Sequence, residues 1–147
     1  MKTILVTGAS SGMGADFAKQ LAEQGHRVYA AARRVEKMAE LKVFGVKPIK
    51  MDITDENDIQ AVVRQIEEET GGIDILVNNA GFGLFSAMED TPLELAKYQF
   101  DVNLFGLARL TQLVFAEGDL QMHLPARHLE YVFRLDFIGK GGTSLPH

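Results

Sequence analysis

The sequence of 147 residues contains no cysteine. The chain can therefore form no disulfide bond, and it offers neither a thiol nucleophile nor a cysteine ligand for a metal ion. No cluster of carboxylates takes the place of such ligands, so we expect no metal site. Long runs of charge of one sign are also absent, and the formal net charge is −5. We therefore expect no nucleic-acid partner.

Long hydrophobic runs are missing as well. The N-terminal stretch "MKTILVTGAS" has a short apolar run that meets glycine at once, which fits neither a signal peptide nor a membrane span. We therefore expect a soluble, cytoplasmic protein without a membrane partner. With 46% hydrophobic and 24% charged residues, the composition is typical of a globular domain with a hydrophobic core.

Short apolar segments alternate with amphipathic segments along most of the chain. Strands are expected at 3–7, 26–32, 46–53 and 73–81, the last running into a turn. Helices are expected at 15–24, 35–44, 54–72 and 91–115. Alternating strands and helices with short connections predict an α/β fold, a Rossmann-like doubly wound parallel sheet with helices on both faces.

Several helix ends carry residues that are typical of caps. Gly25 lies where the first helix should stop. Thr54 and Asp55 are candidates for the N-cap of the third helix. Thr91 and Pro92 are expected at the cap and the first turn of the last, long helix.

The stretch "TGASSGMG" at 7–14 lies where the first strand meets the first helix. Glycines let the backbone turn tightly and approach a pyrophosphate, and the helix N-terminus offers free amide donors and a positive dipole end. The spacing is Gly-x-x-x-Gly-x-Gly, in the strand-to-helix context that a dinucleotide site requires. A tight turn without a ligand is the alternative.

Two arginines, Arg33 and Arg34, directly follow the second strand. A carboxylate at this place binds the ribose hydroxyls of NAD, whereas guanidinium groups pair with a 2′-phosphate. We therefore predict that the chain prefers NADP(H) to NAD(H). The alternative is that both arginines are solvated surface charges.

Four motifs occur together and in order: "TGASSGMG" at 7–14, "MDIT" at 51–54, "NNAG" at 78–81 and "DVNLFG" at 101–106. The combination resembles the short-chain dehydrogenase/reductase family, and most closely its NADP-preferring members, over residues 1–115. The resemblance implies an NAD(P)-dependent oxidoreductase that transfers a hydride between NADP(H) and a small-molecule carbonyl or alcohol. A homo-oligomer is left open.

The resemblance also implies roles for individual residues. The cofactor phosphates and ribose would be lined by Gly8, Ser10, Ser11, Gly12, Met13 and Gly14. Adenine would contact Asp52 and Ile53, and the cofactor ribose would lie beside Asn79, Ala80 and Gly81. The catalytic assignment is Asn103, as the asparagine of the family's proton relay, which holds a helix kink and a water.

Two of these residues have an alternative, purely structural interpretation. Asp52 ends a strand at the ligand-binding edge, where its carboxylate can accept a hydrogen from the adenine amino group, but it is equally suited to cap the next helix. Asn103 lies in an apolar helix, where a buried amide must be paired. That pairing fits a functional role, and it also fits a structural hydrogen bond alone.

The family's proton donor is a tyrosine with a lysine four residues later. Residues Arg33, Val102 and Leu135 stand at that spacing from the three tyrosines, Tyr29, Tyr98 and Tyr131. No Tyr-x-x-x-Lys exists in this chain, and Ser144 is the only serine beyond Ser86. The resemblance therefore predicts a sheet that is incomplete at its C-terminal side.

The composition changes near Phe115. We therefore divide the chain into a dinucleotide-binding Rossmann portion at 1–115 and a divergent tail at 116–147. "LEYVFRLDF" in the tail alternates like a strand, whereas "GKGGTSLPH" has no core-forming pattern. A truncation or frameshift would explain the change. The alternatives to a truncated oxidoreductase are a catalytically inactive, dinucleotide-binding regulator and a nonfunctional truncated product.

Overall fold

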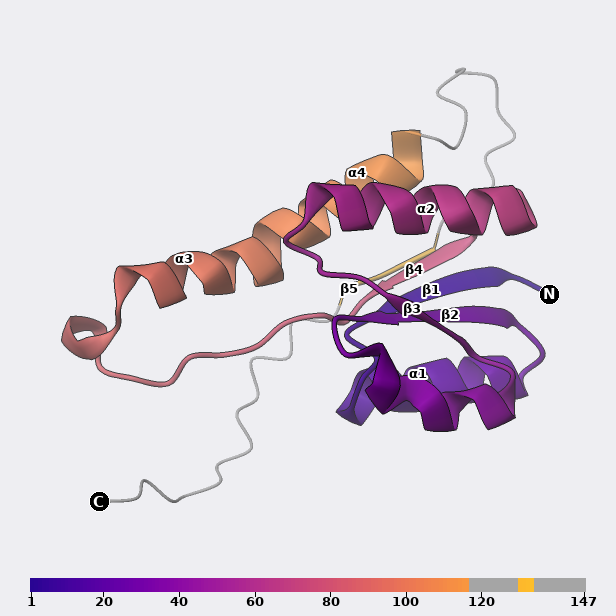
Figure 1. Ribbon diagram of the computed structural model, residues 1–147, viewed down its shortest axis with the longest axis horizontal. Coiled ribbons are helices and arrows are strands. Elements are labelled where there is room, and N and C mark those ends of the chain that lie inside the picture. The colour runs from indigo at the N-terminus through magenta and orange to yellow at the C-terminus, as the bar shows by residue number, and fades with distance from the viewer. Residues whose placement is uncertain (117–129, 134–147) are drawn as a thin grey trace.

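The computed structural model describes the backbone of residues 1–116 and 130–133 (Figure 1). Within this part, one five-stranded parallel sheet has the strand order β3-β2-β1-β4-β5. The strands are β1 (Thr3–Thr7), β2 (Arg27–Ala32), β3 (Lys47–Lys50), β4 (Ile75–Asn78) and β5 (Glu130–Phe133). The predicted α/β, Rossmann-like parallel sheet is confirmed.

Helices cover both faces of this sheet. They are α1 (Gly12–Glu23), the 3-10 helices η1 (Val35–Phe44) and η2 (Met88–Asp90), α2 (Glu56–Thr70), α3 (Leu93–Phe100), the π-helix η3 (Asp101–Gly106) and α4 (Leu107–Ala116). Figure 1 shows α1 on one side of the sheet and α2 and α4 on the other. No helix in the described part is long and apolar enough to cross a membrane.

The core consists of two apolar layers, one on each side of the sheet. In β1, Ile4 and Val6 pack into the layer under α1, and Leu5 packs into the layer under α2 and α4. All three side chains are fully buried, because a parallel strand in the middle of a doubly wound sheet has no solvent face. This burial on both faces explains why Ile4, Leu5 and Val6 form a continuous apolar run in the sequence.

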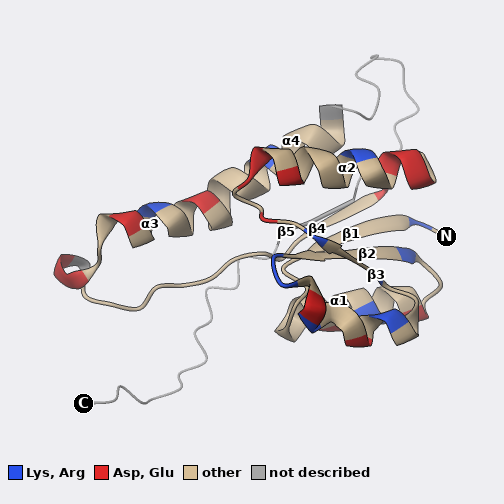
Figure 2. Cartoon of the chain, viewed as in Figure 1, with Lys and Arg blue, Asp and Glu red and all other residues tan. Residues whose placement is uncertain are grey.

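Helix α2 lies within the stretch 54–72 that was predicted to be helical, and one of its two cap candidates begins it. The Asp55 side chain accepts hydrogen bonds from the backbone N–H groups of Asn57 and Asp58 at 2.8 and 3.2 Å, so Asp55 is the N-cap. Gly71, with φ at 82°, provides the left-handed residue that ends the helix. Figure 2 shows acidic residues at both ends of α2.

The sequence pattern predicted one long helix at 91–115, but the structure has three successive helical segments there. Pro92, not Thr91, occupies the N-cap position of α3. The Thr91 hydroxyl instead donates to the Ala87 carbonyl at 2.9 Å and closes the preceding turn. A π-helix, η3, then separates α3 from α4. Within it, a Cβ atom at Gly106 would overlap the Ile53 carbonyl oxygen, so the glycine allows the helix to approach the turn after β3.

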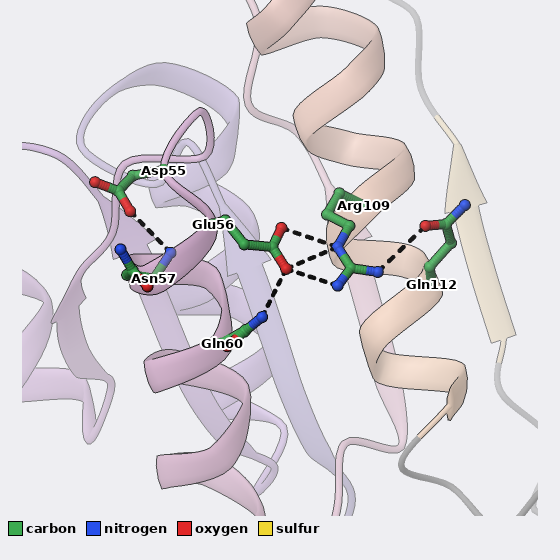
Figure 3. A network of polar contacts seen from close by, with 6 residues as sticks. All are labelled: Asp55, Glu56, Asn57, Gln60, Arg109 and Gln112. Atoms are coloured by element: carbon green, nitrogen blue, oxygen red, sulfur yellow. Dashed lines mark hydrogen bonds and ion pairs between the residues drawn. The ribbon is translucent and has the colours of Figure 1, made fainter.

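Helices α2 and α4 are joined across the same face by an ion pair (Figure 3). The Arg109 guanidinium donates to both carboxylate oxygens of Glu56 at 2.6 to 2.9 Å. The hydrogen bonds from Arg109 lower the pKa of Glu56, and Gln60 contributes a further bond. This contact links α4 to the start of α2.

A strand lies within the segment "LEYVFRLDF". Strand β5 runs parallel to β4, with Ile75 opposite Glu130 and Asn78 opposite Phe133. The other tail residues, at 117–129 and 134–147, lie outside the described part of the chain, and so does the stretch "GKGGTSLPH".

Candidate functional site

The candidate site is a cleft at the carboxyl edge of the sheet. The chain winds outward from β1 through β2 to β3 and then returns to place β4 on the other side of β1. In such sheets, ligands bind where the winding direction reverses, outside the carboxyl ends of the strands. A cleft of about 400 Å³ opens at this place. Topology alone therefore identifies this cleft as the ligand site.

The glycine loop forms one end of the cleft. Gly8 and Gly12 have φ angles of 65° and 56°, which favour glycine. Helix α1 starts at Gly12, earlier than predicted, and Ser11 occupies the N-cap position without a side-chain hydrogen bond to the helix. The first N–H groups of α1 therefore have no cap in the described structure and can bind an anion.

Close backbone contacts hold the glycine loop against the segment after β4. A Cβ atom at Gly14 would lie 2.5 Å from both the Asn79 Nδ2 atom and the Gly8 carbonyl oxygen. A Cβ atom at Gly8 would lie 2.7 Å from the Cα atom of Ala80. Asn79 Nδ2 also donates to the carbonyls of Thr7 and Gly8, both at 3.2 Å. A larger residue at either glycine would fill the narrow space between the glycine loop and the Asn79 segment, which we call the glycine cradle.

Thr7 connects β1 to the same segment. Its side chain is fully buried, and its Oγ1 atom donates to the Val77 carbonyl at 3.3 Å. The same atom accepts from the backbone N–H groups of Asn79 and Ala80, each at 3.0 Å. Sequence reasoning missed this role, although a threonine that ends a buried strand beside the glycine loop is a usable signal.

The basic end of the cleft is formed by Arg33 and Arg34, which are exposed and follow β2. Figure 2 shows this basic segment beside the carboxyl end of the sheet. Arg33 Nη1 donates to the Tyr98 hydroxyl at 2.6 Å. The Arg34 side chain has no hydrogen bond or ion pair within the described residues. One N–H group of Arg33 is thus engaged with the protein, and Arg34 is not engaged by any described residue.

Asp52 lines the cleft where β3 leads toward α2. Its Oδ1 atom accepts from the backbone N–H and the hydroxyl of Thr54, at 2.9 and 2.7 Å. The alternative that Asp52 caps α2 is wrong, because Asp55 does so. Asp52 instead fixes the turn that brings Ile53 to the cleft.

Asn103 lies in η3 and uses its whole amide to hold one residue. Its Oδ1 atom accepts from the Phe82 backbone N–H at 2.9 Å, and its Nδ2 atom donates to the Phe82 carbonyl at 2.6 Å. A Cβ atom at Gly81 would lie 3.1 Å from Asn103 Oδ1. The structural bond predicted for the side chain is therefore present, and the relay role stays a prediction.

Most of the predicted cofactor residues meet in this cleft. Those that line it are Gly8, Ser10, Ser11, Met13, Arg33, Arg34, Asp52, Ile53, Asn79, Ala80 and Gly81. Gly12, Gly14 and Asn103 are not among the lining residues. Gly14 packs against Gly8 and Asn79, and Asn103 bonds to Phe82, so these two contact residues that line the cleft. The residues that sequence reasoning missed are Thr7, Ala31, Ala32, Met51, Phe82, Tyr98 and Val102. These are mainly apolar residues near strand ends and on α3 and η3. Thr7, Met51 and Val102 lie within the quoted motifs, but no cofactor role had been assigned to them.

The arrangement fits a dinucleotide. Open amides at the start of α1, beside glycines that leave no room for a Cβ atom, suit a pyrophosphate. Apolar residues such as Ile53 and Val102 suit an adenine ring, and the free Arg34 guanidinium suits an additional anionic group.

The described tyrosines do not provide a proton donor paired with lysine. Tyr29 is buried, and burial together with its hydrogen bond to Glu69 raises its pKa to about 12. Tyr98 lies at the cleft but is bonded to Arg33. Neither is followed four residues later by a lysine. The described part of the cleft is therefore suited to binding and orienting a ligand.

Known proteins share this arrangement. A probable short-chain type dehydrogenase/reductase, VdlC, from Helicobacter pylori is 38% identical over 109 residues, which cover 74% of this chain and 40% of the relative. The NADPH-dependent 1-acyldihydroxyacetone phosphate reductase of Schizosaccharomyces pombe is 33% identical over 126 residues, covering 81% and 43%. The chain thus spans less than half the length of these curated relatives.

A solved structure agrees with the sequence relatives. The alcohol dehydrogenase from the archaeon Thermococcus sibiricus, complexed with 5-hydroxy-NADP, superposes with a TM-score of 0.74 at 27% identity, over 80% of this chain and 53% of the other. The short chain dehydrogenase family model matches residues 2–121. The match continues past residue 115 and includes the glycine loop, the Asn79 segment and η3. This chain belongs to the short-chain dehydrogenase family.

Proposed function

We propose that this chain forms the NADP(H)-binding part of a short-chain oxidoreductase that transfers a hydride between the nicotinamide and a small carbonyl or alcohol. The observation that carries the proposal is the cleft at the winding reversal, with a glycine cradle at one end and two arginines at the other. Residues 1–115 are the dinucleotide-binding portion in this proposal, and 116–147 are a tail. A cytoplasmic location belongs to the same proposal.

Each end of the cleft would hold a different part of the cofactor. The open N–H groups at the start of α1, next to Ser11, would bind the pyrophosphate. Asp52 and Ile53 would contact the adenine, and the segment of Asn79, Ala80 and Gly81 would pass beside the ribose. The bound cofactor supplies the hydride. This chain's residues bind and orient it, and proton donation is assigned to none of them.

The preference for NADP(H) depends on Arg33 and Arg34. Two guanidinium groups at the end of β2 can form charge-assisted hydrogen bonds to a 2′-phosphate. No carboxylate occupies the position directly after β2 where one would bind the ribose hydroxyls of NAD. The name of the Schizosaccharomyces pombe relative, an NADPH-dependent reductase, supports the same preference.

The test is a titration of the purified protein with NADPH and with NADH, followed by nicotinamide fluorescence. The chain contains no tryptophan, so transfer from an indole does not complicate the signal. We expect saturable binding and a clear preference for NADPH. The double variant Arg33→Ala/Arg34→Ala should weaken NADPH binding by about a hundredfold or more, because each of the two lost charge-assisted bonds is worth about 1.5–3 kcal/mol.

Arg27→Ala/Arg64→Ala provides the matched control. Both arginines are exposed and do not line the cleft, Arg27 at the start of β2 and Arg64 on α2. Their removal changes the net charge by the same two units and should leave both affinities unchanged. Equal weakening of NADPH and NADH in the double variant would refute the preference. Absence of binding by the wild-type protein would refute the whole proposal.

A further inference from the structure

Tyr98 bridges the cleft from the side opposite Arg33. It lies on α3, 65 residues away in sequence, and its hydroxyl accepts the hydrogen bond from Arg33 Nη1 at 2.6 Å. The guanidinium carbon lies 6.0 Å from the centre of the Tyr98 ring. No sequence motif and no assignment from the comparisons accounts for this contact.

The Tyr98 ring is held in place independently of Arg33. It packs at the margin of the apolar layer under α2 and α4, and its centre lies 5.6 Å from that of the Phe82 ring at a tilt of 39°. Phe82 is in turn fixed through its backbone by Asn103. The hydroxyl is therefore a rigid acceptor that belongs to the far side of the cleft.

A fixed acceptor changes what Arg33 can do. An exposed arginine samples many rotamers, and it loses rotamer entropy when a ligand immobilises it. A hydrogen bond from a single N–H group to Tyr98 restrains the guanidinium before a ligand arrives, and the remaining donors stay open to an anion. Arg34 has no such restraint within the described residues.

We propose that Tyr98 is a positioning residue that holds Arg33 ready for the 2′-phosphate and so sets the preference for NADP(H) over NAD(H). This inference rests on the proposed function above. It gives a role to a residue that touches Arg33 across the cleft, and it predicts an effect on the phosphorylated dinucleotide alone.

The test is Tyr98→Phe, which keeps the ring and its packing and removes the acceptor oxygen. We expect the dissociation constant for NADPH to rise roughly three- to tenfold, the range of one hydrogen bond, and that for NADH to change by less than about twofold. The competitors 2′-AMP and 5′-AMP should follow NADPH and NADH respectively, so that Tyr98→Phe weakens the binding of 2′-AMP and leaves that of 5′-AMP unchanged. Tyr29→Phe, the same change at a tyrosine outside the cleft, should leave the NADPH/NADH ratio unchanged.

A double-variant cycle separates this inference from the proposed function. In the Arg33→Ala background, Tyr98→Phe should have no further effect on NADPH binding. If Arg33→Ala reduces the preference and Tyr98→Phe does not, the positioning role is refuted and the proposed function stands. Tighter NADPH binding by Tyr98→Phe would mean that Tyr98 withholds Arg33, which also overturns the inference. If the wild-type protein binds both dinucleotides equally, the proposed function itself fails.

Phe82→Leu is a second variant that leaves the hydroxyl in place. It removes the ring that packs against Tyr98, so we expect a smaller loss of NADPH affinity in the same direction. An unchanged NADPH/NADH ratio in this variant would contradict the rigid-acceptor argument, even if Tyr98→Phe failed to fold.

Discussion

The carboxyl and amino edges of this sheet are held together in different ways. At the carboxyl edge, the glycine loop packs closely against the Asn79 segment, and the Asn79 amide and the buried hydroxyl of Thr7 bond to main-chain atoms there. At the amino edge, exposed side chains form the contacts, such as the Lys47–Glu69 ion pair at 2.6 Å. The carboxyl edge, where the cleft lies, therefore leaves little room for larger side chains, whereas the amino edge is held by side chains whose charges solvent screens.

The largest effect is expected where the carboxyl edge is broken. Gly14→Ala places a Cβ atom 2.5 Å from the Gly8 carbonyl oxygen. Such overpacking costs about 1–3 kcal/mol, which exceeds the gain of up to about 1 kcal/mol that alanine brings to a helix. We expect lower stability in urea unfolding and a loss of NADPH binding in the fluorescence titration.

Gly12→Ala is the natural comparison for this prediction. A Cβ atom there would meet nothing within 4 Å, and only the φ of 56° opposes it. Its stability loss should be the smaller of the two. The reverse order would mean that backbone conformation, and not close packing, limits the glycine loop.

A second break at the carboxyl edge is Thr7→Val, which keeps the shape and removes the hydroxyl. The Ala80 N–H group loses its acceptor, whereas the Asn79 N–H group keeps the Val77 carbonyl at 3.1 Å. A buried group left without a partner costs about 1–3 kcal/mol. Urea unfolding should therefore show a clear loss of stability. Thr3→Val, on the same strand and also buried, should be nearly neutral, and equal losses would contradict the role of Thr7.

The amino edge predicts a pH dependence instead. Hydrogen bonds from Lys47, then from Gln65 and Tyr29, lower the pKa of Glu69 to about 2. A lowered carboxyl pKa stabilises the fold above the unfolded value of about 4.3, and this contribution is lost as the pH falls toward 2. Glu69→Gln should therefore flatten the stability curve in that acid range, as thermal melts at several pH values would show.

The control for this acid prediction is Glu68→Gln, which removes a neighbouring exposed carboxylate. Its stability curve should keep the wild-type slope below pH 4.3. Identical curves for the two variants would mean that the contacts of Glu69 are too weak in solution to matter.

The smallest effect is expected for the exposed ion pair between α2 and α4. Arg109→Gln removes a guanidinium that lies half in solvent beside Glu56, and surface pairs contribute little. The melting temperature should fall slightly, and added salt should shrink the difference between variant and wild type. A large, salt-independent fall would show that α4 depends on this pair for its position.

The carboxyl edge was largely predictable from the sequence because its signals are local. The glycine loop and the β-branched run before it lie within a dozen residues, so the strand, the turn and the helix follow from neighbouring residues. Asp55 likewise caps α2 through groups only two and three residues away.

The rest could not be predicted because it depends on contacts between distant segments. The π-helix at 101–106 packs against Ile53, and helical periodicity cannot show such a contact. The prediction that Thr91 caps the helix was wrong, because the Thr91 hydroxyl bonds to the Ala87 carbonyl in the preceding turn. Tyr98 lies at the cleft because of how α3 packs, whereas the sequence had suggested only a test of whether it could be the proton donor.

The bond between Asn103 and Phe82 has a consequence for how this site can evolve. Among the described residues, the amide of Asn103 pairs with main-chain atoms of Phe82 alone, so it can hold any residue at that position except proline, which has no N–H group. Mutations at position 82 can alter the ring beside Tyr98 without releasing the segment. If Tyr98 has the positioning role proposed above, selection can adjust cofactor preference in small steps through position 82, while the hydrogen bonds from Asn103 keep the path of the chain.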